Sequence, residues 1–144
     1  FLQSSAEKPK LLVAGARGWM ETEVFAEVQT LGIADQVKFL GYVPDLALNA
    51  LMQKAKLFVL ASIVEGFGTP VAASRTSAIP EVSGDDAFYF DPHKPSDIAR
   101  GLHEGWTQET TAQAFAQRGL VRAQGFSWDR TIQEIGKAFL QARG

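Results

Sequence analysis

Short apolar runs alternate with helix-like stretches up to Pro92, and this alternation constrains the fold more than any other feature of the chain. Parallel strands are buried on both faces and appear as continuous apolar runs, whereas helices repeat their apolar residues every three to four positions. The runs that we interpret as strands are 10–15, 37–42, 57–61, 71–73 and 87–90. Strands that alternate with helices build a parallel sheet with right-handed crossovers. The chain is therefore predicted to be an α/β protein, with a Rossmann-like parallel sheet and helices on both faces.

Helices are predicted between these strands and throughout the last third of the chain. They cover about 18–31, 44–55, 96–106, 109–123 and the residues from 127 onward. In the last helix, large apolar residues recur at helical spacing at Trp128, Ile132, Ile135 and Phe139. We expect this stripe to be buried, with the two C-terminal helices packed across the sheet.

Length and composition limit the functions that the chain can have. Its 144 residues suit one domain, and its net charge of −2 with scattered Lys and Arg gives no basis for a nucleic-acid-binding surface. There is no cysteine, which excludes disulfides and thiolate metal sites. No apolar run approaches the roughly 20 residues of a membrane helix. The chain begins without Met or a signal-peptide pattern, so we expect it to be part of a longer protein.

A candidate ligand loop follows the strand at 57–61. Glu65 stands alone there and is followed directly by Gly66, Phe67 and Gly68. Open α/β sheets bind ligands at the carboxyl ends of their strands. Glycines let backbone N–H groups approach a ligand closely, and an isolated carboxylate can accept hydrogen bonds from hydroxyl groups. The stretch therefore predicts a ligand loop, with an ordinary surface turn as the alternative.

The same stretch contains a conflict. Parallel neighbours are joined by crossovers of a dozen or more residues. Only nine residues separate Ala61 from Val71, and their sequence has no helical character. Either these strands are not parallel neighbours, or a crossover helix is missing.

Several segments together resemble the C-terminal, donor-binding half of GT-B-fold glycosyltransferases, and most closely the retaining group known as family 4 (group 1 type). The resemblance covers nearly the whole chain. Its motifs follow the family's order: Leu11–Gly15 with Gly18 and Trp19, Val37–Pro44, Ala61–Gly68, Ala73–Gly84, Phe90–Pro92 and Phe126–Trp128. The resemblance implies that residues 1–144 form the nucleotide-sugar-binding domain without its first strand–helix unit.

The resemblance also implies roles for individual residues. Glu65 is the implied catalytic residue, which accepts hydrogen bonds from the hydroxyls of the donor sugar. The other implied donor-binding positions are Gly15 in a glycine loop, Gly41, Tyr42 and Val43 against the nucleobase, and Gly66, Phe67, Gly68 and Thr69 against the sugar and phosphate. The implied reaction uses no cofactor and no metal. There is no Asp-x-Asp pair, and His93 and His103 stand apart from any carboxylate cluster.

Two departures from the family pattern matter. The family carries a second glutamate eight positions after the first, but Ala73 stands there in this chain, and about ten residues of the pattern are absent. The family's Arg and Lys for the diphosphate belong to a strand and helix that precede this chain. We therefore predict that Gly68 and Thr69 are not bonded neighbours, and that a helix belongs between them.

The implied function is a nucleotide-sugar-dependent glycosyltransferase that retains anomeric configuration, in the synthesis of cell-surface polysaccharides or glycoconjugates. Its partners would be a nucleotide-sugar donor and an acceptor bound by an absent N-terminal domain. Thr76–Glu81 resembles versions found in mannosyl- and rhamnosyltransferases. The expected location is cytoplasmic, with peripheral association at the inner face of the membrane left open. One alternative is a sugar-nucleotide epimerase, whose usual catalytic residues are not visible. The other is a catalytically degenerate binding domain, which the missing second glutamate favours.

Overall fold

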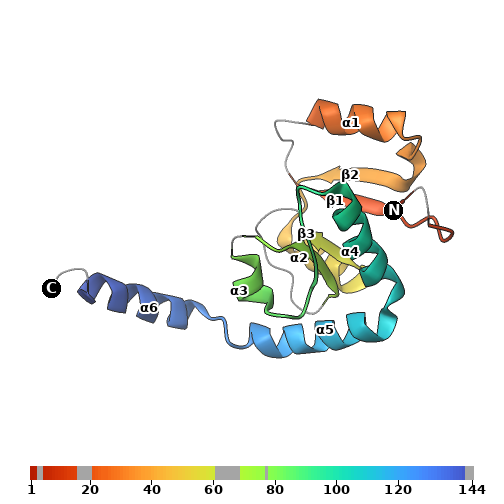
Figure 1. The fold of residues 1–144 in the computed structure, drawn as a ribbon. Helices are drawn as coiled ribbons and strands as arrows, with labels where there is room; N and C mark the ends of the chain where they lie inside the picture. Colours follow the sequence, from red (N-terminus) through yellow and green to blue (C-terminus); the bar gives the residue numbers. More distant parts are fainter. Residues whose placement is uncertain (3–4, 16–20, 61–68, 77, 142–144) are drawn as a thin grey trace. The chain divides into compact units, whose positions relative to one another are not determined.

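The computed structural model of the chain describes residues 1–2, 5–15, 21–60, 69–76 and 78–141 (Figure 1). They form two compact units, Phe1–Lys54 and Ala55–Gly144. All strand pairs described in both units are parallel, as the sequence predicts. The chain is therefore an α/β protein of Rossmann-like type.

The first unit is built on two parallel strands. Its elements are β1 (Leu11–Ala14), α1 (Glu21–Thr30), the short 3-10 helix η1 (Ala34–Gln36), β2 (Val37–Gly41) and α2 (Asp45–Lys54). Leu11 of β1 lies opposite Val37 of β2. The rings of Phe25 on α1 and Phe39 on β2 pack with their centroids 4.2 Å apart. This aromatic contact fixes α1 on the strand pair.

The expected burial of the first strand is wrong. Leu11, Leu12 and Val13 are 37%, 47% and 36% exposed. Among the described residues, β1 has a strand neighbour only on the β2 side. A pair of strands removes far less apolar surface from water than a central strand of a larger sheet does, which accounts for the exposure.

The second unit contains a three-stranded sheet in the order β3-β4-β5. Its elements are β3 (Phe58–Leu60), β4 (Val71–Ser74), α3 (Ile79–Ser83), β5 (Phe88–Phe90), α4 (Pro95–Thr107), α5 (Glu109–Ala123) and α6 (Trp128–Gln141). β3 and β4 are parallel neighbours, with Phe58 opposite Val71. One of the two expected alternatives, that these strands are not neighbours, is therefore wrong. The predicted break between Gly68 and Thr69 lies outside the described residues.

The core of the second unit lies on both faces of β4, all four residues of which are buried. On one face, Val71 and Ala73 pack with Ile79 of α3 and with Ala87. On the other face, Ala72 packs with Phe88, Phe90 and the residues of α4 and α5 that cover them, Ile98, Leu102, Ala112 and Phe115. Side chains of a strand alternate between its faces, so one central strand supports both layers. Helices on both faces of this sheet confirm the predicted arrangement.

The last helix differs from the prediction. α6 forms where it is expected, but its apolar stripe is exposed: Trp128 by 83%, Ile132 by 65%, Ile135 by 52% and Phe139 by 69%. The spacing predicted the common face correctly, and the expected burial is wrong. Among the described residues no element covers this face, and α5 alone of the two C-terminal helices contributes to the described core, through Ala112.

Candidate functional site

Two predicted site glycines meet at the carboxyl ends of β1 and β2. The N–H of Gly15 donates a hydrogen bond to the carbonyl oxygen of Gly41, 2.9 Å away. Gly41 has φ of 67°, a left-handed conformation that glycine adopts without strain. A Cβ at either glycine would have no other atom of the described residues within 4 Å, so among these residues the space beside the two glycines is open. Tyr42, 76% exposed, and the half-buried Val43 follow Gly41 directly.

The structure therefore brings four of the predicted donor-binding residues, Gly15, Gly41, Tyr42 and Val43, to one edge of the first unit. This is the carboxyl edge, where open α/β sheets bind ligands. The predicted ligand loop, Glu65, Gly66, Phe67 and Gly68, lies outside the described residues. Thr69 is described and is buried just before the amino end of β4, where the neighbouring Pro70 accepts a hydrogen bond from the N–H of Phe58 at 2.8 Å.

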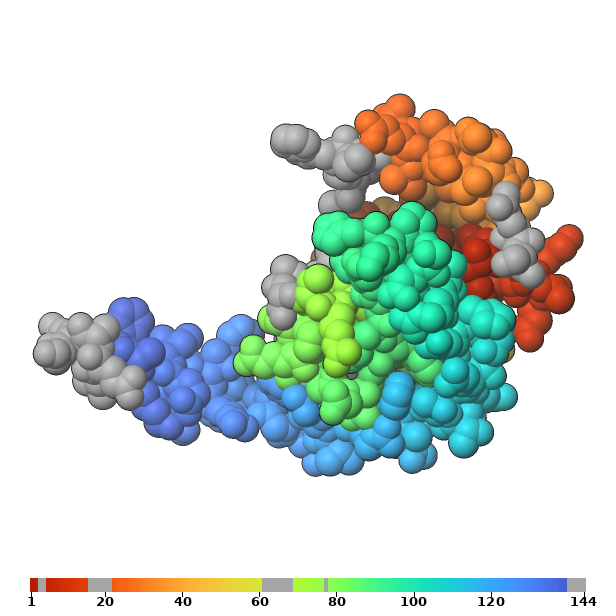
Figure 2. Space-filling view, in the orientation of Figure 1, coloured from red at the N-terminus to blue at the C-terminus, as the bar shows by residue number. Residues whose placement is uncertain are grey.

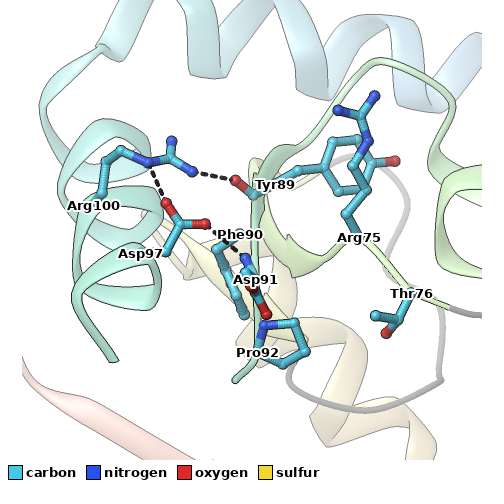
Figure 3. Close-up of a pocket in the computed structure, with 8 residues that line it drawn as sticks. All are labelled: Arg75, Thr76, Tyr89, Phe90, Asp91, Pro92, Asp97 and Arg100. Atoms are coloured by element: carbon cyan, nitrogen blue, oxygen red, sulfur yellow. Dashed lines mark hydrogen bonds and ion pairs between the residues drawn. The ribbon is translucent and has the colours of Figure 1, made fainter. Parts of the chain in front are cut away.

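The second unit has a cavity of about 370 Å³ at the carboxyl ends of β4 and β5. Its lining residues are Arg75 and Thr76 after β4, Tyr89 and Phe90 in β5, Asp91 and Pro92 after β5, and Asp97 and Arg100 on α4 (Figure 3). In the space-filling view, the part of the chain coloured green to teal, which includes these residues, forms a stretch of the outer surface (Figure 2). The cavity of the second unit lies at the carboxyl edge of its strands, as the two glycines do in the first unit.

Arg100 organises one side of this cavity. Its guanidinium donates to Asp97 at 2.7 Å, to Glu104 at 2.8 Å and to the backbone carbonyl of Tyr89 at 2.9 Å. The other oxygen of Asp97 accepts a hydrogen bond from the N–H of Asp91 at 2.7 Å. Helix α4 is therefore tied to the end of β5 through side chains at its first turns (Figure 3).

Both cavity carboxylates are held in their ionised form. Asp91 accepts a hydrogen bond from the N–H of His93 at 3.0 Å and pairs with the ammonium of Lys94 at 3.1 Å. These two contacts lower the pKa of Asp91 below its ordinary value, the hydrogen bond being the larger cause. The pKa of Asp97 is lowered chiefly by its hydrogen bond from Arg100, and then by that from Asp91. Each negative charge in the cavity thus has a direct partner.

The opposite side of the cavity is formed by Tyr89, Arg75 and Thr76. The guanidinium carbon of Arg75 lies 5.3 Å from the centre of the Tyr89 ring, within the range of a cation–π contact. The Tyr89 hydroxyl donates to the carbonyl of Gly84 at 2.5 Å, and burial is the main cause that raises its pKa. Arg122 of α5 donates to the carbonyls of Glu81 and Val82 at 2.7 and 2.6 Å, so it ties α3 to α5.

The sequence prediction did not assign these cavity residues to a site. A signal was present, because Arg75 and Asp91 each come directly after a buried strand and therefore lie at its carboxyl end. The contacts of Arg100 with Asp97 and Glu104 have the i,i+3 and i,i+4 spacing of a helix. The bonds that join this group to the end of β5 could not be found in the same way, since they depend on the position of α4 over β5. Among the described residues, no group of three or more His, Asp or Glu side chains is placed to hold a metal ion. No described helix has the length and apolar character needed to cross a membrane.

Parallel strands that alternate with helices define an α/β domain of the Rossmann-like class, and such domains bind ligands at the carboxyl ends of their strands. The family model described as glycosyl transferases group 1 matches residues 2–121 of this chain. The chain therefore belongs to the group 1 glycosyltransferase family, as the sequence motifs indicate.

Curated relatives agree with this membership. The chain is 30% identical over 139 aligned positions to the O-antigen chain mannosyltransferase B of Escherichia coli, an alignment that includes 90% of this chain and 36% of the relative. It is 28% identical over 138 positions to a D-inositol 3-phosphate glycosyltransferase of Thermobifida fusca, covering 87% of this chain and 32% of that protein. The chain thus spans about a third of the length of these relatives.

A solved structure agrees with the fold. Sucrose-phosphate synthase from Thermosynechococcus elongatus superposes with a TM-score of 0.76 at 21% identity, over 92% of this chain and 38% of that one. At this identity the likeness concerns the fold alone, and it confirms the α/β architecture of a GT-B protein.

Proposed function

We propose that this chain is the donor-binding domain of a nucleotide-sugar-dependent glycosyltransferase. The observation that carries the proposal is the meeting of Gly15 and Gly41 at an open carboxyl edge, in a chain that belongs to the group 1 glycosyltransferases. In this proposal, the nucleobase lies against Gly41, Tyr42 and Val43, where backbone groups pair with its edge. The exposure of Tyr42 leaves that surface accessible to a ligand.

Glu65 carries the chemistry in this proposal. Its carboxylate accepts hydrogen bonds from hydroxyls of the donor sugar, and the backbone of Gly66 to Gly68 binds the sugar and phosphate. Thr69 is left out of this site, because it is buried at the amino end of β4. The leaving diphosphate is stabilised by hydrogen-bond donors and by positive charge rather than by a resident metal or cofactor. Transfer proceeds with retention at the anomeric carbon, and the leaving phosphate helps to deprotonate the acceptor.

The biological setting is also proposed from the relatives. The Escherichia coli relative is named as an O-antigen chain mannosyltransferase, which favours a mannosyl donor and a role in cell-surface polysaccharide synthesis. The chain covers 36% of that relative, so we assign the acceptor to residues outside this chain. A cytoplasmic location, with association at the inner face of the membrane as an open alternative, stays a prediction.

The replacement Glu65→Ala in the full-length enzyme tests this proposal. Loss of a charge-assisted hydrogen bond to the sugar costs about 1.5–3 kcal/mol, so we expect transfer to fall roughly tenfold to more than a hundredfold. Transfer from a panel of radiolabelled nucleotide-sugars measures this. Glu134→Ala, which removes an exposed carboxylate from α6, is the control and should keep full activity. If Glu65→Ala transferred sugar as fast as the natural enzyme, Glu65 would not be the catalytic residue.

A second candidate is a degenerate binding domain without turnover, and the connection between β3 and β4 favours it. These strands are parallel neighbours, yet only the ten residues 61–70 join them. The alignment with the Escherichia coli relative has 139 positions, whereas 90% of 144 residues is about 130, so about nine positions have no residue in this chain. A deletion of this size fits the absent helix and its second glutamate.

Peptide mapping of the natural protein across residues 57–75 separates the two candidates. The glycosyltransferase proposal expects additional residues between Gly68 and Thr69, including a glutamate. A peptide in which Gly68 and Thr69 are joined would show that the deletion is genuine. In that case the binding domain becomes the better proposal.

A further inference from the structure

The side chain of Tyr42 is free of contacts that would serve the fold in the described part of the chain. It is 76% exposed and makes no hydrogen bond or ring contact with another described residue. The other tyrosine of the chain, Tyr89, is half-buried, donates its hydroxyl hydrogen to the carbonyl of Gly84, and contacts Arg75 through its ring. Single apolar side chains are common on protein surfaces, so the position of Tyr42 decides what its exposed ring means.

The backbone places Tyr42 at the open edge of the first unit. The register of β1 against β2 shifts between Val13 and Ala14, an irregularity of the β-bulge type. Gly41 then adopts the left-handed conformation, with φ of 67°. Bulges are frequent next to ligand sites, where they redirect a side chain. Tyr42 is the next residue, directly beyond the hydrogen bond that joins Gly15 to Gly41.

A nucleobase presents two kinds of surface to a protein, a polar edge and a flat face. In the proposed function, backbone groups of Gly41, Tyr42 and Val43 pair with the edge, which leaves both faces without a partner. Aromatic side chains bind the faces of bases by stacking, and this contact accepts every base because every base has a π-face. The exposed ring of Tyr42 is an aromatic surface of this kind at the same edge.

We propose that the ring of Tyr42 stacks on one face of the nucleobase and makes Tyr42 a base-binding residue through its side chain. The inference rests on the proposed function and deepens it, because it separates affinity from selectivity at the donor site. The stacked ring supplies affinity for any base, whereas the backbone groups that pair with the edge set the preferred base. Loss of the ring therefore weakens all nucleotides together and leaves their order unchanged.

Calorimetric titration of the full-length protein with UDP, GDP and dTDP tests the stacking. Tyr42→Ala should weaken every nucleotide that the natural protein binds by about tenfold or more, and the preferred base should stay the same. Tyr42→Phe and Tyr42→Trp keep an aromatic face and should keep the affinity. Leu120→Ala, which shortens an exposed apolar side chain of α5, is the control and should change no affinity. Urea unfolding shows whether each variant is folded.

The possible results separate the stacking from the donor site itself. If folded Tyr42→Ala binds the nucleotides as the natural protein does, the stacking is wrong and the donor-site proposal stands. If Tyr42→Phe loses as much affinity as Tyr42→Ala, the hydroxyl makes the contact and the stacking is again wrong. If the natural protein binds none of the nucleotides, both the donor site and the stacking are overturned.

Discussion

Gly41 is the residue whose backbone links the sequence most directly to the proposed donor site. Its φ of 67° would strain any residue with a Cβ, by about 1–2 kcal/mol. Gly32, at the end of α1, has φ of 64° and the same open surroundings, but it follows a helix rather than a strand. The two glycines therefore form a matched pair, with equal strain and different positions.

We predict that Gly41→Ala and Gly32→Ala lower the free energy of unfolding by similar amounts, about 1–2 kcal/mol in urea titrations. Only Gly41→Ala should also weaken binding of a nucleoside diphosphate, because the methyl group and the shifted Gly41 carbonyl alter the carboxyl edge. Calorimetry on both variants measures this difference. Equal nucleotide affinities in the two variants would show that Gly41 does not contact the ligand.

The carboxylates of Asp91 and Asp97 make the stability of the second unit depend on pH. Their pKa values are lowered in the folded protein relative to the ordinary value of 3.8. The stabilisation is thus present above pH 3.8 and is lost as the pH falls through the lowered folded values. The urea concentration at which half of the protein is unfolded should therefore fall as the pH drops below 3.8. We predict that this fall is less steep in Asp97→Asn than in the natural protein. The control Asp129→Asn, on α6, should keep the slope of the natural protein. A slope unchanged in Asp97→Asn would contradict the role of the Arg100 network.

At the level of elements, α4 lies close to the sheet because two of its residues are glycines. A Cβ at Gly101 would come within 3.0 Å of the Phe90 ring and 3.5 Å of the Phe88 carbonyl oxygen. These atoms belong to buried residues of β5, whose rings and backbone have little freedom to move. In α6, by contrast, a Cβ at Gly136 would meet nothing within 4 Å.

We predict opposite effects of the same substitution in these two helices. Gly136→Ala should raise stability by about 0.5–1 kcal/mol, because alanine is the better helix former. Gly101→Ala should lower stability by about 1–2 kcal/mol net, since overpacking exceeds the gain in helix propensity. Chemical unfolding of the two variants measures both values. Stabilisation by Gly101→Ala would show that α4 can move away from β5.

The elements that the sequence predicts well are those with a strong periodic pattern. The continuous apolar runs located β1 to β5, and α5 has the bounds that were expected, 109–123. α3 was not predicted, because a helix of five residues starting at Ile79 and Pro80 has no room for a periodic pattern. Burial was the weaker inference. Apolar spacing places Trp128 and Ile132 on one face of α6, but it cannot tell what covers that face.

The candidate site shows the same limit. Glycines at strand ends are visible in the sequence, and the structure brings Gly15 and Gly41 together as predicted. The cavity at Arg75 depends on the pairing of β4 with β5, with Ser74 opposite Phe90. Such pairing is a property of the folded sheet, and residues 16 positions apart carry no local sign of it.

At the level of the whole molecule, the chain contains parallel strands and helices of a glycosyltransferase but covers about a third of the length of the relatives described above. In the proposed function, the 144 residues supply the surface for the donor, and the remaining part of the protein supplies the acceptor site. The proposed donor site is therefore the feature on which the account depends most.

Calorimetric titration of the full-length protein with UDP, GDP and dTDP tests the donor site most directly. The account predicts saturable binding with one preferred base, weakened by Gly41→Ala and unchanged by Gly32→Ala. The account is contradicted if none of the three nucleotides binds, or if DNA binds more tightly than all of them at physiological salt.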